Sequence, residues 1–211
     1  FTHPGAQDDV NGAVRNAAAQ LQKLGATVEE VSIPEHRDAW QFLWPIGLEG
    51  MATLARGNLQ GRHHSGRYDA GLADFFGAAR LSQPVTKALT VKFMISAGEY
   101  LHERYHGRLY AKAQNLRAGL RAKYDAVLSK YDALVMPSTP MKAHRRDERA
   151  PYAMLTNTAT FDITGHPGLS VPCGMGDGLP IGLMLIGRHF EDATLLRLGY
   201  AYEQSVDWRK V

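Results

Sequence analysis

The sequence has little that would support a disulfide scaffold, a membrane span or a nucleic-acid interface. Cys173 is the one cysteine among 211 residues, which excludes an internal disulfide framework and any multi-cysteine metal site. No apolar run of roughly 18 residues and no signal-peptide core occurs, so we expect a soluble, cytoplasmic protein without a membrane partner. The formal net charge of +3 is too small to predict nucleic-acid binding.

Several familiar short motifs are also absent. No serine lies in a G-x-S-x-G elbow. The spaced glycines Gly174, Gly176 and Gly178 are not followed by the helix that would bind phosphate at its N-terminus. The residues alone therefore supply no complete catalytic constellation. Because the chain begins at Phe1 and its first methionine is Met51, we expect a piece of a longer protein.

The hydrophobic pattern that is present indicates an α/β protein. Apolar residues recur at helical spacing from about Asp8 to Leu24, and Gly25 ends that helix. Residues 26–33 are rich in β-formers and stop before Pro34, so they are predicted to form a strand. Further strands are predicted near 132–136, 169–173 and 181–187. The predicted fold class is α/β, a mixed β-sheet covered by α-helices.

Three further helical segments are predicted, over 37–55 with a bend near Pro45, over 85–128 in two pieces, and over 192–204. The first of these is followed by a loop. The run Leu183–Ile186 is apolar without alternation. Such a run is typical of a strand that is covered on both faces.

One short pattern matches a metalloprotease motif. His102, Glu103 and His106 form H-E-x-x-H, which on a helix would place two imidazoles one turn apart for zinc and a glutamate for the attacking water. A third ligand is not evident, because Leu109 stands where the longer metzincin motif needs glycine. On a straight helix Asp125 would lie ~28 Å from His106. A packing helix without metal is therefore the favoured interpretation.

The remaining titratable groups have ordinary structural interpretations. His63 and His64 lie in a glycine-rich stretch and are predicted to be solvated loop residues. His166 precedes Pro167 and is predicted to be a turn residue with a local hydrogen bond. Cys173 lies among apolar residues with no basic neighbour, so we expect a buried, unreactive thiol.

A long stretch of the chain resembles the C-terminal hallmark of the amidase signature family. The most specific block is residues 157–174, NTATFDITGHPGLSVPCG, with its sequel DGLPIGLMLIGR at 177–188. The strand YDALVMPSTP at 131–140, the first helix with LGATVEEV at 24–31, and ATLL at 193–196 are similar to the family as well. The resemblance thus extends from near the first residue to near the last.

This resemblance implies the C-terminal portion of the amidase signature fold. Residues 1–211 would be the C-terminal part of a single amidase domain, whose preceding part carries a Ser-Ser-Lys triad on a glycine-rich double-serine loop. No such loop occurs in this chain, and its serines are isolated in sequence: Ser32, Ser65, Ser82, Ser96, Ser129, Ser138, Ser170 and Ser205. No catalytic residue is therefore assigned within the chain.

The function implied by the resemblance is hydrolysis of a carboxylic acid amide to the acid and ammonia or an amine. A serine would attack the carbonyl and form an acyl-enzyme, without metal or cofactor. The expected partners are a small-molecule amide and either the missing N-terminal half or another copy of the chain. We expect the isolated chain to be inactive.

Four substrate-binding residues are proposed on the same basis. Glutamine-specific relatives hold the charged ends of their substrate with an arginine and an aspartate, and an ungapped alignment places these positions near Phe93 and Leu155. Both residues are apolar here, which favours aliphatic or aromatic amides, because an apolar wall cannot pair a buried carboxylate. Thr160 and Phe161 are further pocket candidates, with core packing as the alternative.

Two alternatives to an amidase fragment remain. The first is a non-catalytic or amidotransferase subunit of the same fold, which composition does not separate from a hydrolase. The second is a zinc metallopeptidase that uses His102-Glu103-x-x-His106.

Overall fold

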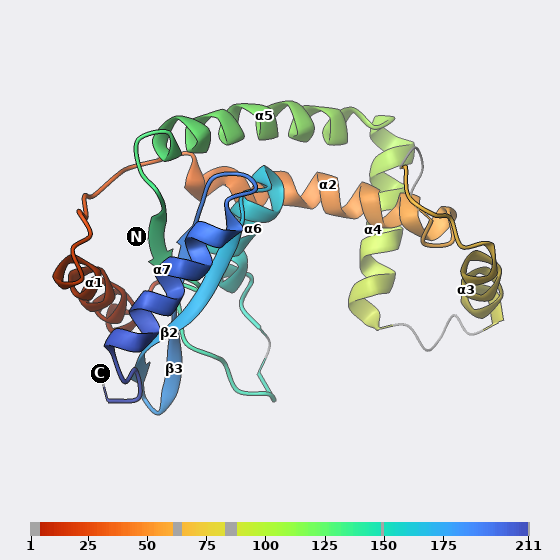
Figure 1. Ribbon diagram of the computed structural model, residues 1–211. Helices are drawn as coiled ribbons and strands as arrows, with labels where there is room; N and C mark the ends of the chain where they lie inside the picture. Colours follow the sequence, from red (N-terminus) through yellow and green to blue (C-terminus); the bar gives the residue numbers. More distant parts are fainter. Residues whose placement is uncertain (1–4, 61–64, 83–87, 149, 211) are drawn as a thin grey trace. The chain divides into compact units, whose positions relative to one another are not determined.

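The computed structural model describes residues 5–60, 65–82, 88–148 and 150–210 (Figure 1). The chain divides into two compact units, one formed by residues up to Trp40 together with those from Arg117 onward, and one formed by Gln41–Leu116. Helices α2 (His36–Arg56) and α5 (Arg108–Leu128) each contribute to both units.

The first unit contains a three-stranded antiparallel sheet with the order β1-β3-β2. Its strands are β1 (Leu134–Pro137), β2 (Gly168–Gly176) and β3 (Leu179–Ile186). Asp177 and Gly178 connect β2 to β3 with φ values of 51° and 77°. Positive φ at both central positions is the requirement of a tight hairpin turn, and Asp-Gly meets it at little steric cost.

Two helices cover one face of this sheet. Helices α1 (Asp8–Lys23) and α7 (Asp192–Ser205) both contact the β2–β3 hairpin. Their buried side chains share one core with the sheet, formed by Val10, Val14, Ala17, Leu21, Val171, Cys173, Ile181, Leu183, Leu185, Leu195 and Tyr202. The predicted helices near both ends of the chain are thereby confirmed.

The sheet itself confirms much of the predicted α/β fold. The segments near 132–136, 169–173 and 181–187 are strands, and the residues of Leu183–Ile186 are at most 5 % exposed. Both faces of that strand are therefore covered, as the absence of alternation indicated.

A short helical segment precedes β2. The 3₁₀ turn η2 (Tyr152–Leu155) leads directly into α6 (Thr156–Thr164). Seven of the nine α6 residues are buried, and only Thr158 and Asp162 reach the surface. The centroid of the Phe161 ring lies 5.2 Å from that of the Tyr124 ring on α5, in an edge-to-face arrangement. Aromatic pairs favour this arrangement.

The second unit is helical in its described residues. It holds most of α2, the helices α3 (Ala70–Ser82) and α4 (Leu89–Tyr105), and the first half of α5. Gly98 of α4 approaches α2 so closely that an added Cβ would overlap the carbonyl oxygen of Leu48. Among the described residues, no helix is long and apolar enough to cross a membrane.

The prediction of a strand over residues 26–33 is wrong. These residues have no regular secondary structure, and Val31 is 41 % exposed. A strand needs a neighbouring ladder of N–H and C=O groups, and none of the described strands pairs with this segment. A composition rich in β-forming residues is therefore not enough to make residues 26–33 a strand.

Candidate functional site

The four predicted substrate-binding residues fall into two classes of exposure. Phe93 on α4 is 57 % exposed and Leu155 at the end of η2 is 50 % exposed, so each side chain presents an apolar surface to solvent. Thr160 and Phe161 on α6 are buried in the core. The structure does not bring all four together within one unit, because Phe93 belongs to the second unit and the others to the first. Their binding role stays a prediction.

A cavity of about 240 Å³ lies in the first unit, beside the start of β3. Its lining is largely apolar and is formed by Val10, Thr139, Met141, Lys142, Ala143, Met154, Pro180, Ile181 and Gly182. This volume is below the range of about 300–1,000 Å³ that is usual for drug-sized ligands. A small apolar group or a side chain fits such a space.

The lysine in this cavity is held by two carboxylates. Lys142 forms ion pairs with Asp9 and, at 2.9 Å, with Asp177. Hydrogen bonds to these carboxylates raise the pKa of Lys142, first through Asp9 and then through Asp177. Because its charged form is favoured, Lys142 is poorly suited to act as a general base.

Two serines that are far apart in sequence meet beside this cavity. The Oγ atoms of Ser138 and Ser170 lie 2.5 Å apart. A Cβ on Gly182 would lie within 3 Å of both hydroxyls, so glycine is what permits the contact. These two serines are isolated in sequence and become neighbours only in the fold. No described imidazole, lysine or carboxylate hydrogen-bonds to either hydroxyl, so the pair lacks the base that an activated nucleophile needs.

A buried hydrogen-bond network joins α2, α5, α6 and β1 within the first unit. His36 Nδ1 lies 2.7 Å from the Tyr124 hydroxyl, and its Nε2 lies 3.3 Å from Asn157 Oδ1. Asn157 in turn donates to the carbonyl of Pro137 at 2.7 Å. Burial lowers the pKa of His36 and raises that of Tyr124. These neutral groups therefore serve to position the elements on which they lie.

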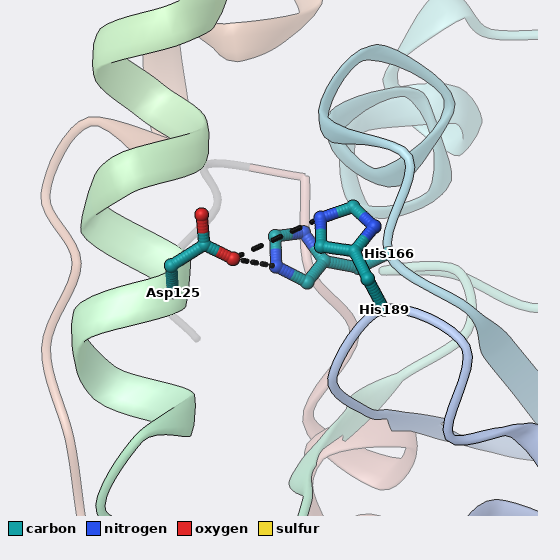
Figure 2. Close-up of side chains that lie close together, drawn as sticks. All are labelled: Asp125, His166 and His189. Atoms are coloured by element: carbon teal, nitrogen blue, oxygen red, sulfur yellow. Dashed lines mark hydrogen bonds and ion pairs between the residues drawn. The ribbon is translucent and has the colours of Figure 1, made fainter.

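Asp125, His166 and His189 form a second polar cluster in the first unit (Figure 2). Asp125 lies on the last turn of α5, whereas the histidines lie in the loops before β2 and after β3. Because Gly168 pairs with Ile186, these two loops leave the same end of the hairpin. The sequence indicated a local hydrogen bond for His166, and the 2.9 Å contact from its Nδ1 to Thr164 Oγ1 confirms it. The spacing of the three residues in sequence gave no signal for the cluster.

The H-E-x-x-H segment does not lie on a single helical turn. Helix α4 ends at Tyr105, and His106 occupies the left-handed C-cap with φ of 52°. His102 Nδ1 lies 3.7 Å from the buried carboxylate of Glu49. Among the described residues, the one group of three side chains close enough to share a metal does not include His102 or His106. His63 and His64 lie outside the described residues.

Cys173 is buried, as the sequence predicted. Burial among the core residues raises the pKa of its thiol to about 11. A thiol with a raised pKa is mostly protonated at neutral pH, and the thiolate is the nucleophile. Cys173 is therefore a core residue.

The fold is that of amidases. It matches the peptide amidase from Stenotrophomonas maltophilia with a TM-score of 0.59 and 26% identity, over 94% of this chain and 40% of that chain. In sequence, the chain is 39% identical to an enantioselective amidase from Rhodococcus rhodochrous over 98% of its own length and 42% of the relative's. It is 34% identical to a glutamyl-tRNA(Gln) amidotransferase subunit from Geobacillus sp. (strain WCH70), with coverages of 98% and 43%.

The chain belongs to the amidase family, whose model, described as Amidase, matches residues 1–196. The resemblance found in the sequence is thereby confirmed. The chain spans about two-fifths of the length of these two curated relatives.

Proposed function

We propose that the whole protein is an amidase that works through a serine acyl-enzyme. A serine Oγ attacks the amide carbonyl carbon, the C–N bond breaks, and the nitrogen leaves as ammonia or an amine after it accepts the serine proton. Water then hydrolyses the acyl ester, which releases the acid and regenerates the serine. Membership of the amidase family carries this proposal.

The catalytic serine and its base belong, in this proposal, to a part of the protein outside residues 1–211. The support is chemical, because the Ser138–Ser170 pair has no base partner among the described residues and Lys142 is engaged by two carboxylates. The missing half is then the partner that completes the site. Residues 1–211 contribute helices, part of the sheet and apolar surface for the substrate.

Simple aliphatic or aromatic amides are the proposed substrates. Phe93 and Leu155 are both exposed and apolar, and neither can pair the α-carboxylate or α-ammonium of glutamine. The relatives include both an enantioselective amidase and a glutamyl-tRNA(Gln) amidotransferase subunit. An amidotransferase subunit that uses glutamine is therefore the second candidate, and it predicts the opposite substrate preference.

The substrate preference can be measured on the full-length protein as ammonia release. We expect benzamide-type and aliphatic amides to be hydrolysed with a higher kcat/KM than glutamine. Leu155→Ala should lower kcat/KM for benzamide by about 5- to 30-fold, because it removes apolar contact area worth about 1–2 kcal/mol.

Leu196→Ala on α7 is the matched control, since Leu196 is also exposed, at 60 %. Leu196→Ala should leave kcat/KM unchanged for both benzamide and glutamine. Glutaminase activity that exceeds benzamide hydrolysis would refute this substrate class and favour the amidotransferase candidate.

A further inference from the structure

We propose that Asp125, His166 and His189 form a binding site for a divalent transition-metal ion, best fitted by Zn²⁺. One ligand atom from each of the three side chains lies within 4.8 Å of the others. Two imidazoles and a carboxylate are a donor set that suits zinc, with water as a fourth ligand. The site is separate from the proposed amide chemistry and does not depend on it.

The distances around the carboxylate suit a tetrahedral ion. Asp125 Oδ1 lies 3.1 Å from His166 Nε2 and 3.8 Å from His189 Nε2 (Figure 2). With metal–ligand bonds of about 2.0–2.1 Å, neighbouring ligand atoms of a tetrahedral zinc lie about 3.3 Å apart. The observed separations bracket that value, so small side-chain rotations suffice.

The Nε2 nitrogen of His189 is buried and makes no hydrogen bond in the described part of the chain. A buried polar atom without a partner is costly. A metal ion held between His189 Nε2 and Asp125 Oδ1 would satisfy it.

His166 already has the outer-shell contact that a metal ligand needs. The side chain is fully buried, and its Nδ1 lies 2.9 Å from Thr164 Oγ1. When Nε2 binds a metal, the proton resides on Nδ1, which can donate to the threonine hydroxyl and fix the ring orientation. Burial, followed by the nearby His189, also lowers the pKa of His166, and the neutral imidazole is the form that binds metal.

Hydrogen bonds near the site hold the two loops that carry the histidines in place. Gly187 N donates to the carbonyl of Pro167 at 3.1 Å, which ties the two loops together. Arg188 Nη1 donates to the carbonyl of Leu128 at 3.3 Å, which anchors the second loop to the end of α5. The site therefore rests on three elements that are already joined.

One basic side chain opposes metal binding. Arg121 Nε lies 3.7 Å from Asp125 Oδ2, and both side chains are about half exposed. Exposed pairs of this kind are worth about 0–1 kcal/mol. The guanidinium therefore weakens the affinity of the site for a cation but does not prevent binding.

The test is Zn²⁺ titration of the metal-free full-length protein by calorimetry, with Co²⁺ absorption as a second readout of coordination. We expect one equivalent of Zn²⁺ and a tetrahedral Co²⁺ spectrum. His189→Gln and Asp125→Asn should each weaken binding at least about 100-fold, since even outer-shell changes cost about 10- to 100-fold. Arg121→Gln should strengthen it about two- to fivefold.

His144→Gln is the matched control, because His144 is exposed and lies outside the cluster. It should bind Zn²⁺ as the parent chain does. His189 and Asp125 are not fully buried, so circular dichroism should show both variants folded. The proposal is overturned if no stoichiometric Zn²⁺ binds, or if binding survives unchanged in Asp125→Asn and His189→Gln.

Discussion

Residues 1–211 on their own should hydrolyse no amide, whereas addition of the preceding half of the protein should restore turnover. Acyl transfer needs a nucleophile, a base within hydrogen-bond reach and fixed oxyanion donors. The serine pair at Ser138 and Ser170 has no base partner among the described residues. Loss of members of such a catalytic unit typically costs ~10⁴–10⁶ in rate.

The measurement is an amide panel assayed with the isolated chain, with the separately produced preceding half, and with both together. Host amidases must first be removed. The matched variant is Ser138→Ala, which should not change the activity of the combined halves by more than about twofold. Turnover by the isolated chain that is abolished in Ser138→Ala or Ser170→Ala would show that the chain carries its own nucleophile.

Gly98→Ala should destabilise the chain by about 3 kcal/mol, near the upper end of the usual cost of overpacking. The added methyl group would overlap the backbone carbonyl of Leu48 and touch Ala52. Neither α2 nor α4 can yield easily, because the clash is with backbone. Urea unfolding should show a lower midpoint with an unchanged slope.

Gly50→Ala is the control for this effect. Gly50 lies on α2 in the same unit, and no atom lies within 4 Å of the position of an added Cβ. Alanine should stabilise the helix there by roughly 0.5–1 kcal/mol, because it restricts the unfolded chain. Equal effects of the two substitutions would contradict the close packing of α4 on α2.

The sequence was sufficient for elements whose pattern is local. The helical spacing up to Leu24 and the non-alternating run Leu183–Ile186 identified α1 and β3. The break between α4 and α5 falls at His106 and Gly107, which both have positive φ. Such a break also removes His106 from the helix that H-E-x-x-H requires.

Elements that depend on distant contacts were harder to predict. Helix α6 contains four threonines and is buried on almost all sides, so it shows neither helical propensity nor an amphipathic pattern. Residues 26–33 have the composition of a strand but no paired neighbour among the described residues. In both cases tertiary contacts override local preference.

The two polar clusters could not be predicted from the sequence for the same reason. Ser138 and Ser170 are 32 positions apart, and Asp125 and His166 are 41 apart. Only the pairing of β1 and β2 with β3, and the packing of α5 near the hairpin, bring them together. No spacing rule for a single helix or loop finds such residues, whereas the H-E-x-x-H motif fits such a rule although its His106 lies beyond the end of α4.

The location of the acylated serine tests the account most directly. The full-length protein should be treated with a fluorophosphonate, which labels activated serines, and then digested and mapped by mass spectrometry. We expect one labelled serine, in the part of the protein that precedes Phe1, with labelling unchanged in Ser138→Ala and Ser170→Ala. A label on Ser138, Ser170 or any other serine of residues 1–211 would contradict it.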